Sequence, residues 1–141
     1  MLVAVTDLTG AARAIEDEYG LRAEEGGRHP GWGTANCIVP LGDAYLELVT
    51  AVDAARSARS SFGRWVRASQ SELFRPCGWA VRTNELDEVA SRLDLTIEAG
   101  SRTGRDGELS SSDPRLATRS FWAPLSPKAA AIASARKDIR P

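Results

Sequence analysis

Histidine and cysteine are scarce in this sequence of 141 residues, which contains one histidine and two cysteines. Cys37 and Cys77 lie singly within apolar stretches, far apart along the chain. Isolated cysteines of this kind are typical of buried free thiols, and thiols stay reduced in the cytoplasm. We therefore expect a cytoplasmic protein with two free thiols.

Long apolar runs and an excess of charge are also missing. No apolar stretch reaches the roughly 20 residues that a helix needs to cross a bilayer. The N-terminal segment MLVAVTDLTG lacks the basic and apolar regions of a secretion signal. The chain has 18 basic and 19 acidic residues, with a formal net charge of −1, so its charge gives no reason to expect nucleic-acid binding. We expect neither a membrane nor a nucleic acid as a partner.

The residues that are present predict one globular domain that begins with a strand and a helix. Leu2–Val5 is short, apolar and partly β-branched, as strands are. Asp7 stands where a helix cap belongs, because its carboxylate can accept the free amide hydrogens of a first turn. Apolar residues then recur at helical spacing as far as Tyr19, and Gly20 is expected to end the helix. These apolar positions are Leu8, Ala11, Ala12, Ile15 and Tyr19.

Three further strands are expected before residue 53. Leu21–Glu25 can form one strand, which leads into a glycine-rich loop at Gly26–Gly33. Thr34–Pro40 and Ala44–Val52 are separated by a glycine-aspartate turn and predict a β-hairpin. Together with the first strand and helix, they make residues 1–53 a complete βαβββ module.

The second strand of this hairpin carries the most notable residue of the chain. Side chains alternate along a strand, so Tyr45, Glu47 and Val49 share one face, and Leu46 and Leu48 share the other. The two leucines suit packing under a helix. Glu47 is then an acid between an aromatic residue and a valine on the opposite face of the sheet.

Residues 54–72 predict a connecting helix. Phe62, Trp65 and Val66 give it a narrow apolar stripe. Its arginines are interpreted as a solvated helix face rather than a nucleic-acid surface. They are Arg56, Arg59, Arg64 and Arg67.

A second module is expected over residues 73–107. Pro76–Arg82 is of strand type, and Asn84 can cap a helix after it. When Val3–Ala12 is aligned with Val81–Ala90, the end of the strand, the helix cap and the first leucine of the helix occur in the same order in both segments. Few residues are identical, but the shared order favours two copies of one motif.

The tail, residues 108–141, departs from this pattern. Leu95–Ala99 would be the second strand of the second module, Arg115–Leu125 could be a strand, and Pro127–Lys137 is mildly helical. The second hairpin that a full repeat requires is not visible. We therefore predict an α+β fold of paired βαβββ modules, the second incomplete or divergent. A ferredoxin-like α+β sandwich is the alternative.

Several motifs resemble a known family. They are Gly26-Gly27-Arg28-His29-Pro30, Gly33-Thr34-Ala35-Asn36, Tyr45-Leu46-Glu47-Leu48 and Gly78-Trp79-Ala80-Val81-Arg82-Thr83. With these motifs the chain resembles the glyoxalase-like domains of the vicinal oxygen chelate superfamily over roughly residues 1–107. The resemblance implies modules whose sheets curl around a shared cleft. In metal-using members it also implies a divalent ion held by four side chains, from the first and last strands of each module.

The ligand positions implied by the resemblance are poorly filled in this chain. Glu47 matches the glutamate of the last strand of module one. The first-strand histidine of module one would fall before Met1, and Gly78 stands at its counterpart in module two. A divalent metal needs several converging donors. We therefore expect no conventional metal site within one chain. Binding through Glu47 stays open if a partner chain or an upstream segment supplies further ligands.

Two residues allow more than one interpretation. His29 is either an acid/base group or a loop residue that packs on the hairpin or faces water. Trp79 either lines an apolar cleft opposite Tyr45 and Glu47 or belongs to the core. The candidate catalytic residues are Glu47 and His29. The candidate ligand-binding residues are Asn36, Ile38, Tyr45 and Trp79.

Three functions are compatible with these residues. The first is a homodimeric protein that binds a small, partly apolar molecule between its modules without a metal cofactor. The second is a lyase, isomerase or dioxygenase that uses Glu47 as a base or metal ligand, with His29 as a helper. The third is a remnant without activity. One scaffold hosts many chemistries, so the resemblance alone does not choose among them.

Overall fold

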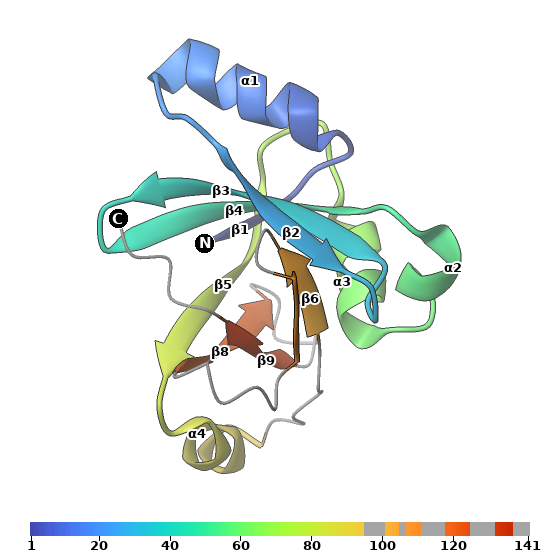
Figure 1. The fold of residues 1–141 in the computed structure, drawn as a ribbon, viewed down its shortest axis with the longest axis vertical. Coiled ribbons are helices and arrows are strands. Elements are labelled where there is room, and N and C mark those ends of the chain that lie inside the picture. The colour runs from blue at the N-terminus through green and yellow to red at the C-terminus, as the bar shows by residue number, and fades with distance from the viewer. Residues whose placement is uncertain (95–100, 105–106, 111–117, 125–131, 137–141) are drawn as a thin grey trace.

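The chain folds around one mixed sheet, shown in the computed structural model of Figure 1. The structure describes residues 1–94, 101–104, 107–110, 118–124 and 132–136. Its strands are β1 (Leu2–Ala4), β2 (Glu24–His29), β3 (Thr34–Leu41), β4 (Ala44–Ala51), β5 (Pro76–Thr83), β6 (Ser101–Gly104), β7 (Gly107–Ser110), β8 (Thr118–Pro124) and β9 (Ile132–Arg136). Its helices are α1 (Leu8–Tyr19), α2 (Ala54–Ser57), α3 (Ser61–Ser69) and α4 (Leu86–Arg92). The expected α+β class is confirmed.

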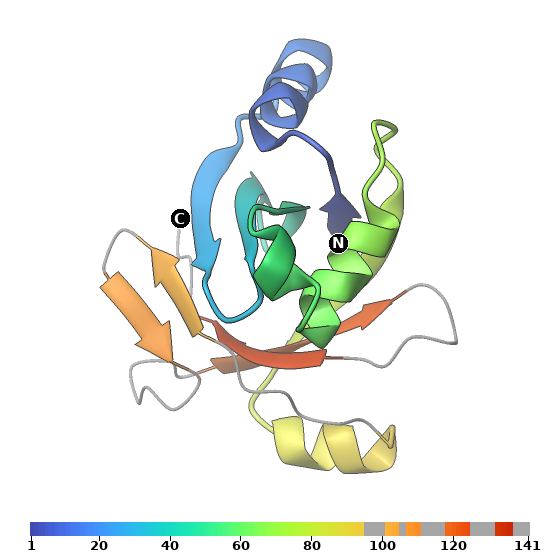
Figure 2. The ribbon, with the colours of Figure 1, turned by 90° about the vertical axis from the view of Figure 1, so that its right-hand side faces the viewer.

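The order of the described strands places β1 where the two halves of the sheet meet. That order is β7-β6-β2-β3-β4-β1-β5-β8-β9. β1 pairs in parallel with β4 and antiparallel with β5. Figures 1 and 2 show α1 at one end of the molecule and α4 at the opposite end. Within the described part of the chain, no helix is long and apolar enough to span a bilayer.

The first module has the expected order of strand, helix and three strands. Asp7 caps α1, because its Oδ1 accepts a hydrogen bond from the backbone N–H of Thr9 at 3.0 Å. Gly20 ends the helix with a φ of 67°, and its N–H donates to the carbonyl oxygen of Glu16. Both termini of this helix were therefore readable from the sequence.

The two faces of the β3–β4 hairpin are those predicted. Leu48 is fully buried in a core cluster with Val3 and Ile15 beneath α1, and Leu46 packs against that cluster. On the opposite face, Val49 belongs to a second core cluster with Phe62 of α3. Glu47 shares this second face because it lies two residues from Val49.

The glycine-rich stretch is only partly a loop. The sequence predicted a loop over Gly26–Gly33, but β2 continues to His29, so only Pro30–Gly33 turns. β2 extends this far because it pairs with β3 along its length. Glycine is required at Gly33, whose φ is 66°, because a β-carbon there would lie 2.6 Å from the backbone nitrogen of Ser57.

The connection between the modules forms two helices instead of one. Ser60 separates α2 from α3 and caps α3 by accepting a hydrogen bond from the N–H of Gly63 at 2.9 Å. Its hydroxyl also donates to the carbonyl oxygen of Trp32. A serine cap with extended backbone begins a new helix, which explains why the predicted single helix is broken at Ser60.

The start of the second half follows the internal repeat. The two leucines that the repeat aligns, Leu8 and Leu86, are the first residues of α1 and α4. Glu85, not the expected Asn84, is the N-cap of α4, and its side chain makes no capping hydrogen bond. The second module therefore repeats the strand and helix of the first with a different helix start.

Beyond α4 the two halves diverge, as expected. The sequence showed no second hairpin, but the described residues form two, β6–β7 and β8–β9. The mildly helical prediction for Pro127–Lys137 is wrong at Ile132–Arg136, because β9 pairs with β8 and this pairing overrides the weak helix propensity of its alanines. β5 pairs antiparallel with β8, whereas β1 pairs in parallel with β4. The strand expected at Leu95–Ala99 lies outside the described residues.

Candidate functional site

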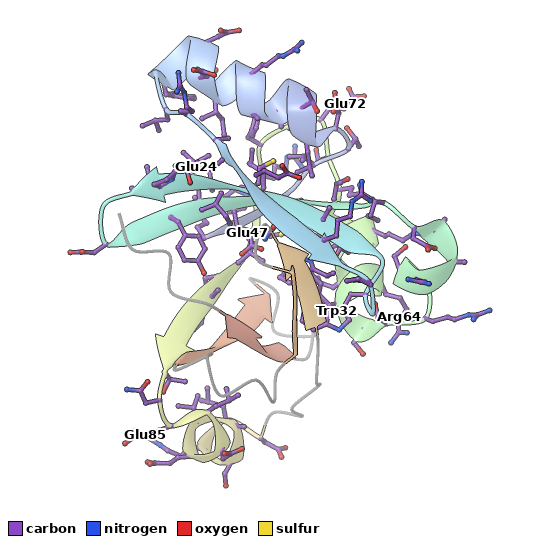
Figure 3. All side chains as sticks on the ribbon, in the orientation of Figure 1. Glu24, Trp32, Glu47, Arg64, Glu72 and Glu85 are labelled. Carbon is purple, nitrogen blue, oxygen red and sulfur yellow. The ribbon has the colours of Figure 1, made fainter. Side chains whose placement is uncertain are left out.

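The centre of the sheet aligns one residue from each of four neighbouring strands. Ile38 lies opposite Glu47 in the β3–β4 pairing. Leu2 lies opposite Glu47 on one side and opposite Gly78 on the other. Glu47 is 1% exposed, and Figure 3 shows it near the middle of the molecule. A carboxylate is thus buried where the first module meets β5.

A buried hydrogen bond joins Glu47 to the adjacent strand. The Nδ2 of Asn36 donates to Oε1 of Glu47 at 2.5 Å, and both residues are buried. Asn36 shares this face of the sheet with Ile38, because the two lie two residues apart on β3. The Oδ1 of Asn36 is also buried and accepts no hydrogen bond from the described residues. Buried acceptors normally have a donor, so this atom is a candidate for contact with a ligand.

His29 lies in an aromatic cluster beside α3. It is 4% exposed, and its Nδ1 lies 2.9 Å from the hydroxyl oxygen of Thr34. Its ring centroid lies 5.6 Å from that of Trp32 and 6.2 Å from that of Phe62. Figure 3 shows Trp32 near α3, at a distance from Glu47. The single histidine is therefore buried among aromatic rings.

His29 and Glu47 lie on the same sheet face but are not brought together. His29 is opposite Thr34 on β3, and Glu47 is opposite Ile38. Thr34 and Ile38 are four residues apart on the strand, which corresponds to about 13 Å. Asn36 lies between them and contacts Glu47. The two candidate catalytic residues therefore belong to separate parts of this face.

The remaining candidate residues differ in their surroundings. Tyr45 is half-buried on the same face as Glu47, and its carbonyl oxygen accepts a hydrogen bond from the amino group of Met1 at 3.0 Å. Trp79 is 41% exposed and lies beside Ala80, which packs against the core cluster of Phe62. Because side chains alternate along β5, Trp79 points to the face of the sheet opposite the one that carries Ala80 and this core cluster.

Cys77 lies close to the buried carboxylate. Its Sγ donates a hydrogen bond to the carbonyl oxygen of Leu2 at 3.5 Å. Burial raises the pKa of the Cys77 thiol, and the negative charge of Glu47 raises it further, while backbone hydrogen bonds at Ala4 and Cys77 lower it. No pattern in the sequence indicated this proximity, because Cys77 and Glu47 lie on strands that are distant along the chain.

The side chains of the described residues do not form the four-ligand metal site that the resemblance implied. Within the described ranges, no group of three or more histidine, cysteine, aspartate or glutamate residues lies together. Gly78 lies opposite Leu2, and Leu2 lies opposite Glu47, but glycine has no side-chain atom that could bind a metal ion. The chemistry available around Glu47 is therefore acceptance of hydrogen bonds by a carboxylate and an amide oxygen.

Some residues near the site were missed from the sequence. Thr34 holds the ring of His29, and Phe62 packs on it. Gly26 lies against the side chain of Asn36. A signal for Gly26 was present, because a glycine within a strand often marks a bulge or a close approach of another group. It was missed because this stretch was assigned to a loop.

Comparison with known proteins identifies a family and a similar fold. The model of a family described as a glyoxalase-like domain matches residues 1–134. The fold is similar to that of a hypothetical protein from Staphylococcus aureus, known from a crystal structure, with a TM-score of 0.64 and 12% sequence identity. That similarity covers 97% of this chain and 57% of the other, so this chain spans little more than half of its length. No curated protein matches the chain.

Proposed function

This chain belongs to the family of glyoxalase-like domains, and from that premise we propose that it binds a small, partly apolar molecule. The ligand would lie between the first module and β5, on the sheet face that carries Asn36 and Glu47. No conventional metal site is needed for this binding. Glu47 and the Oδ1 of Asn36 would accept hydrogen bonds, while Ile38 and Tyr45 would contact the apolar part.

The buried pair of Asn36 and Glu47 is the observation that carries the proposal. Burial of a polar or charged group costs free energy unless the group is hydrogen-bonded. The Asn36 Nδ2 satisfies one oxygen of Glu47, and the Oδ1 of Asn36 accepts nothing from the described residues. A ligand that donates a hydrogen bond offsets this cost, and its apolar part gains from contact with Ile38.

Phenol and toluene are a matched pair of probes for this proposal. Both contain a benzene ring, but phenol carries a hydroxyl group that can donate a hydrogen bond, whereas toluene carries a methyl group. We expect phenol to cause saturable shifts of the β3 and β4 backbone amide resonances in NMR spectra. The affinity for toluene should be lower by about tenfold, because toluene cannot make the hydrogen bond to a charged group. Equal affinity for both probes, or no saturable binding of either, would overturn the proposal and favour a remnant without activity.

Two variants test whether phenol binds at Glu47. Glu47→Gln weakens phenol binding, because an amide oxygen is a weaker acceptor than a carboxylate. Glu24→Gln is the control, because Glu24 is an exposed carboxylate on β2. Equal losses in both variants would mean that the probe responds to net charge and not to the site.

Metal content separates the proposal from a metal-dependent lyase, isomerase or dioxygenase that uses Glu47. The protein is purified without chelator or affinity-tag metal and dialysed against a mixture of divalent ions. Mass spectrometry then measures the metal that the protein retains. We expect none above the buffer level. Near-stoichiometric metal would favour the enzyme.

The proposal includes a homodimer in the cytoplasm. Strands β7 and β9 end the sheet formed by the described residues, and open sheet edges favour pairing with another chain. Both cysteines are free, which suits a reducing compartment.

A further inference from the structure

Gly26 occupies an irregular position in β2. The pairing of β2 with β3 shifts register between Glu25, which lies opposite Cys37, and Gly27, which lies opposite Asn36. Gly26 is the extra residue of this β-bulge and is half-buried. Bulges re-aim side chains close to sites of function, and the atoms nearest to a β-carbon built at Gly26 belong to Asn36.

The absence of a side chain at Gly26 makes room for the Asn36 amide. A β-carbon on Gly26 would lie 2.9 Å from Cγ of Asn36 and 3.0 Å from its backbone oxygen, and closer still to Oδ1. Real β-carbons almost never come closer than 3.0 Å to another heavy atom, so the contacts with the side chain of Asn36 would force it to move. The side chain of Asn36 therefore fills the space that any larger residue at position 26 would occupy.

The backbone conformation does not explain this glycine. Among the described glycines, the left-handed φ values belong to Gly20, Gly33 and Gly42. Gly26 has no such φ, so its backbone accepts an L-residue without strain. The contact with Asn36 is what requires a glycine here.

We propose that Gly26 is a positioning residue, which orients Asn36 so that Nδ2 donates to Glu47. This inference rests on the proposed function and extends it by one residue. With Oδ1 lodged over Gly26, the planar amide directs Nδ2 towards Oε1 of Glu47. A methyl group at position 26 displaces Oδ1, so the amide rotates and the hydrogen bond to the carboxylate is lost.

The test compares four variants with the wild-type chain. They are Gly26→Ala, Gly31→Ala, Asn36→Ala and the double variant Gly26→Ala/Asn36→Ala. Gly31 is the matched control, because its φ is also not left-handed and a β-carbon there would meet nothing within 4 Å. The side-chain amide resonances of Asn36 are assigned by their loss in Asn36→Ala. Phenol affinity and urea unfolding are measured for every variant.

We expect Gly26→Ala to shift the Asn36 side-chain resonances and to weaken phenol binding by about tenfold, as Asn36→Ala does. Gly31→Ala leaves both unchanged. The double variant unfolds at a higher urea concentration than Gly26→Ala, because the crowded amide is gone, but it does not regain phenol binding. If Gly26 had a purely structural role, Gly26→Ala would lower the stability without shifting the Asn36 side-chain resonances or changing the phenol affinity of the folded protein.

The outcomes separate this inference from the proposed function. Unchanged Asn36 resonances in Gly26→Ala, with phenol affinity within about twofold of wild type, would overturn the positioning role. The proposed function would still stand if Asn36→Ala lost binding. Absence of phenol binding by the wild type would count against the proposed function, and the Asn36 resonances would then decide the inference alone.

Discussion

The carboxylate of Glu47 acts on the thiol of Cys77 across an intervening strand. Burial is the main cause of the raised pKa of Cys77, and the charge of Glu47 adds to it. Glu47 lies on β4 and Cys77 on β5, with β1 between them. A charge in the first module therefore influences a nucleophile in the second half of the chain.

This relationship predicts how fast Cys77 is alkylated. The thiolate is the reactive form, so a raised pKa slows reaction with iodoacetamide near pH 8. Glu47→Gln removes the negative charge and lowers the pKa of Cys77, so alkylation becomes faster. We expect this increase in a Cys37→Ser background, measured by mass spectrometry at several pH values.

Cys37 gives the control for this experiment. Burial and the charge of Glu25 raise its pKa, and Glu47 is not among the causes. In a Cys77→Ser background, Glu47→Gln leaves the rate of Cys37 alkylation unchanged. A matching increase at Cys37 would show general loosening of the fold instead of a local charge effect.

Both raised thiol pKa values also predict how stability changes in alkaline solution. Each thiol is favoured as the neutral form in the folded state. Its contribution to stability is full below the ordinary pKa of 9.0 and is lost as the pH rises through the folded value. We expect the urea midpoint to fall above about pH 9, and to fall less in a Cys37→Ser/Cys77→Ser variant. Equal falls would assign the change to other groups.

Leu48 and Leu46 are expected to differ in their contributions to stability. Leu48 is completely buried in the core cluster that contains Val3 and Ile15, whereas Leu46 is half-buried and packs against that cluster. Leu48→Ala lowers the free energy of unfolding by about 2–5 kcal/mol, and Leu46→Ala by less. Urea unfolding measures both. A larger loss at Leu46 would contradict the observed packing.

Asn36 and Glu47 are expected to affect stability differently. Glu47→Gln keeps an acceptor for the Asn36 Nδ2, so the free energy of unfolding changes little. Asn36→Ala removes a buried donor to a charged group and costs about 1–3 kcal/mol. A severe loss of stability in Glu47→Gln would assign the carboxylate a structural role.

Ser60 is expected to stabilise the junction between α2 and α3. Its hydroxyl oxygen accepts a hydrogen bond from the N–H of Gly63, and its O–H donates one to the carbonyl oxygen of Trp32. Ser60→Ala costs about 1–2 kcal/mol, as the loss of a helix cap does. Ser61→Ala is the control, because Ser61 is exposed and begins the helix itself. Similar losses in both variants would contradict the capping role.

Much of the first module could be predicted because its signals are local. The cap at Asp7, the terminating Gly20 and the alternation around Glu47 each depend on a few neighbouring residues. The extent of β2 could not be predicted in the same way, because pairing with β3 turns a glycine-rich stretch into a strand. The strand at Ile132–Arg136 likewise depends on β8.

The candidate site was likewise predictable only in part. Sequence alternation predicted that Tyr45, Glu47 and Val49 share a face, and the hairpin register adds Asn36 and Ile38 to it. The hydrogen bond from Asn36 to Glu47 crosses between the two strands of the hairpin, whereas the burial of His29 beside Phe62 and the proximity of Cys77 join segments that are distant along the chain. No local pattern encodes them.

The central position of β1 has a consequence for the order in which the protein folds. β1 is made before both strands that flank it, since β4 ends at Ala51 and β5 at Thr83. Pairing between segments so far apart in sequence is slow, because long loops must close first. During synthesis, one side of β1 can therefore pair once β4 has been made, while its other side stays open until β5 has followed.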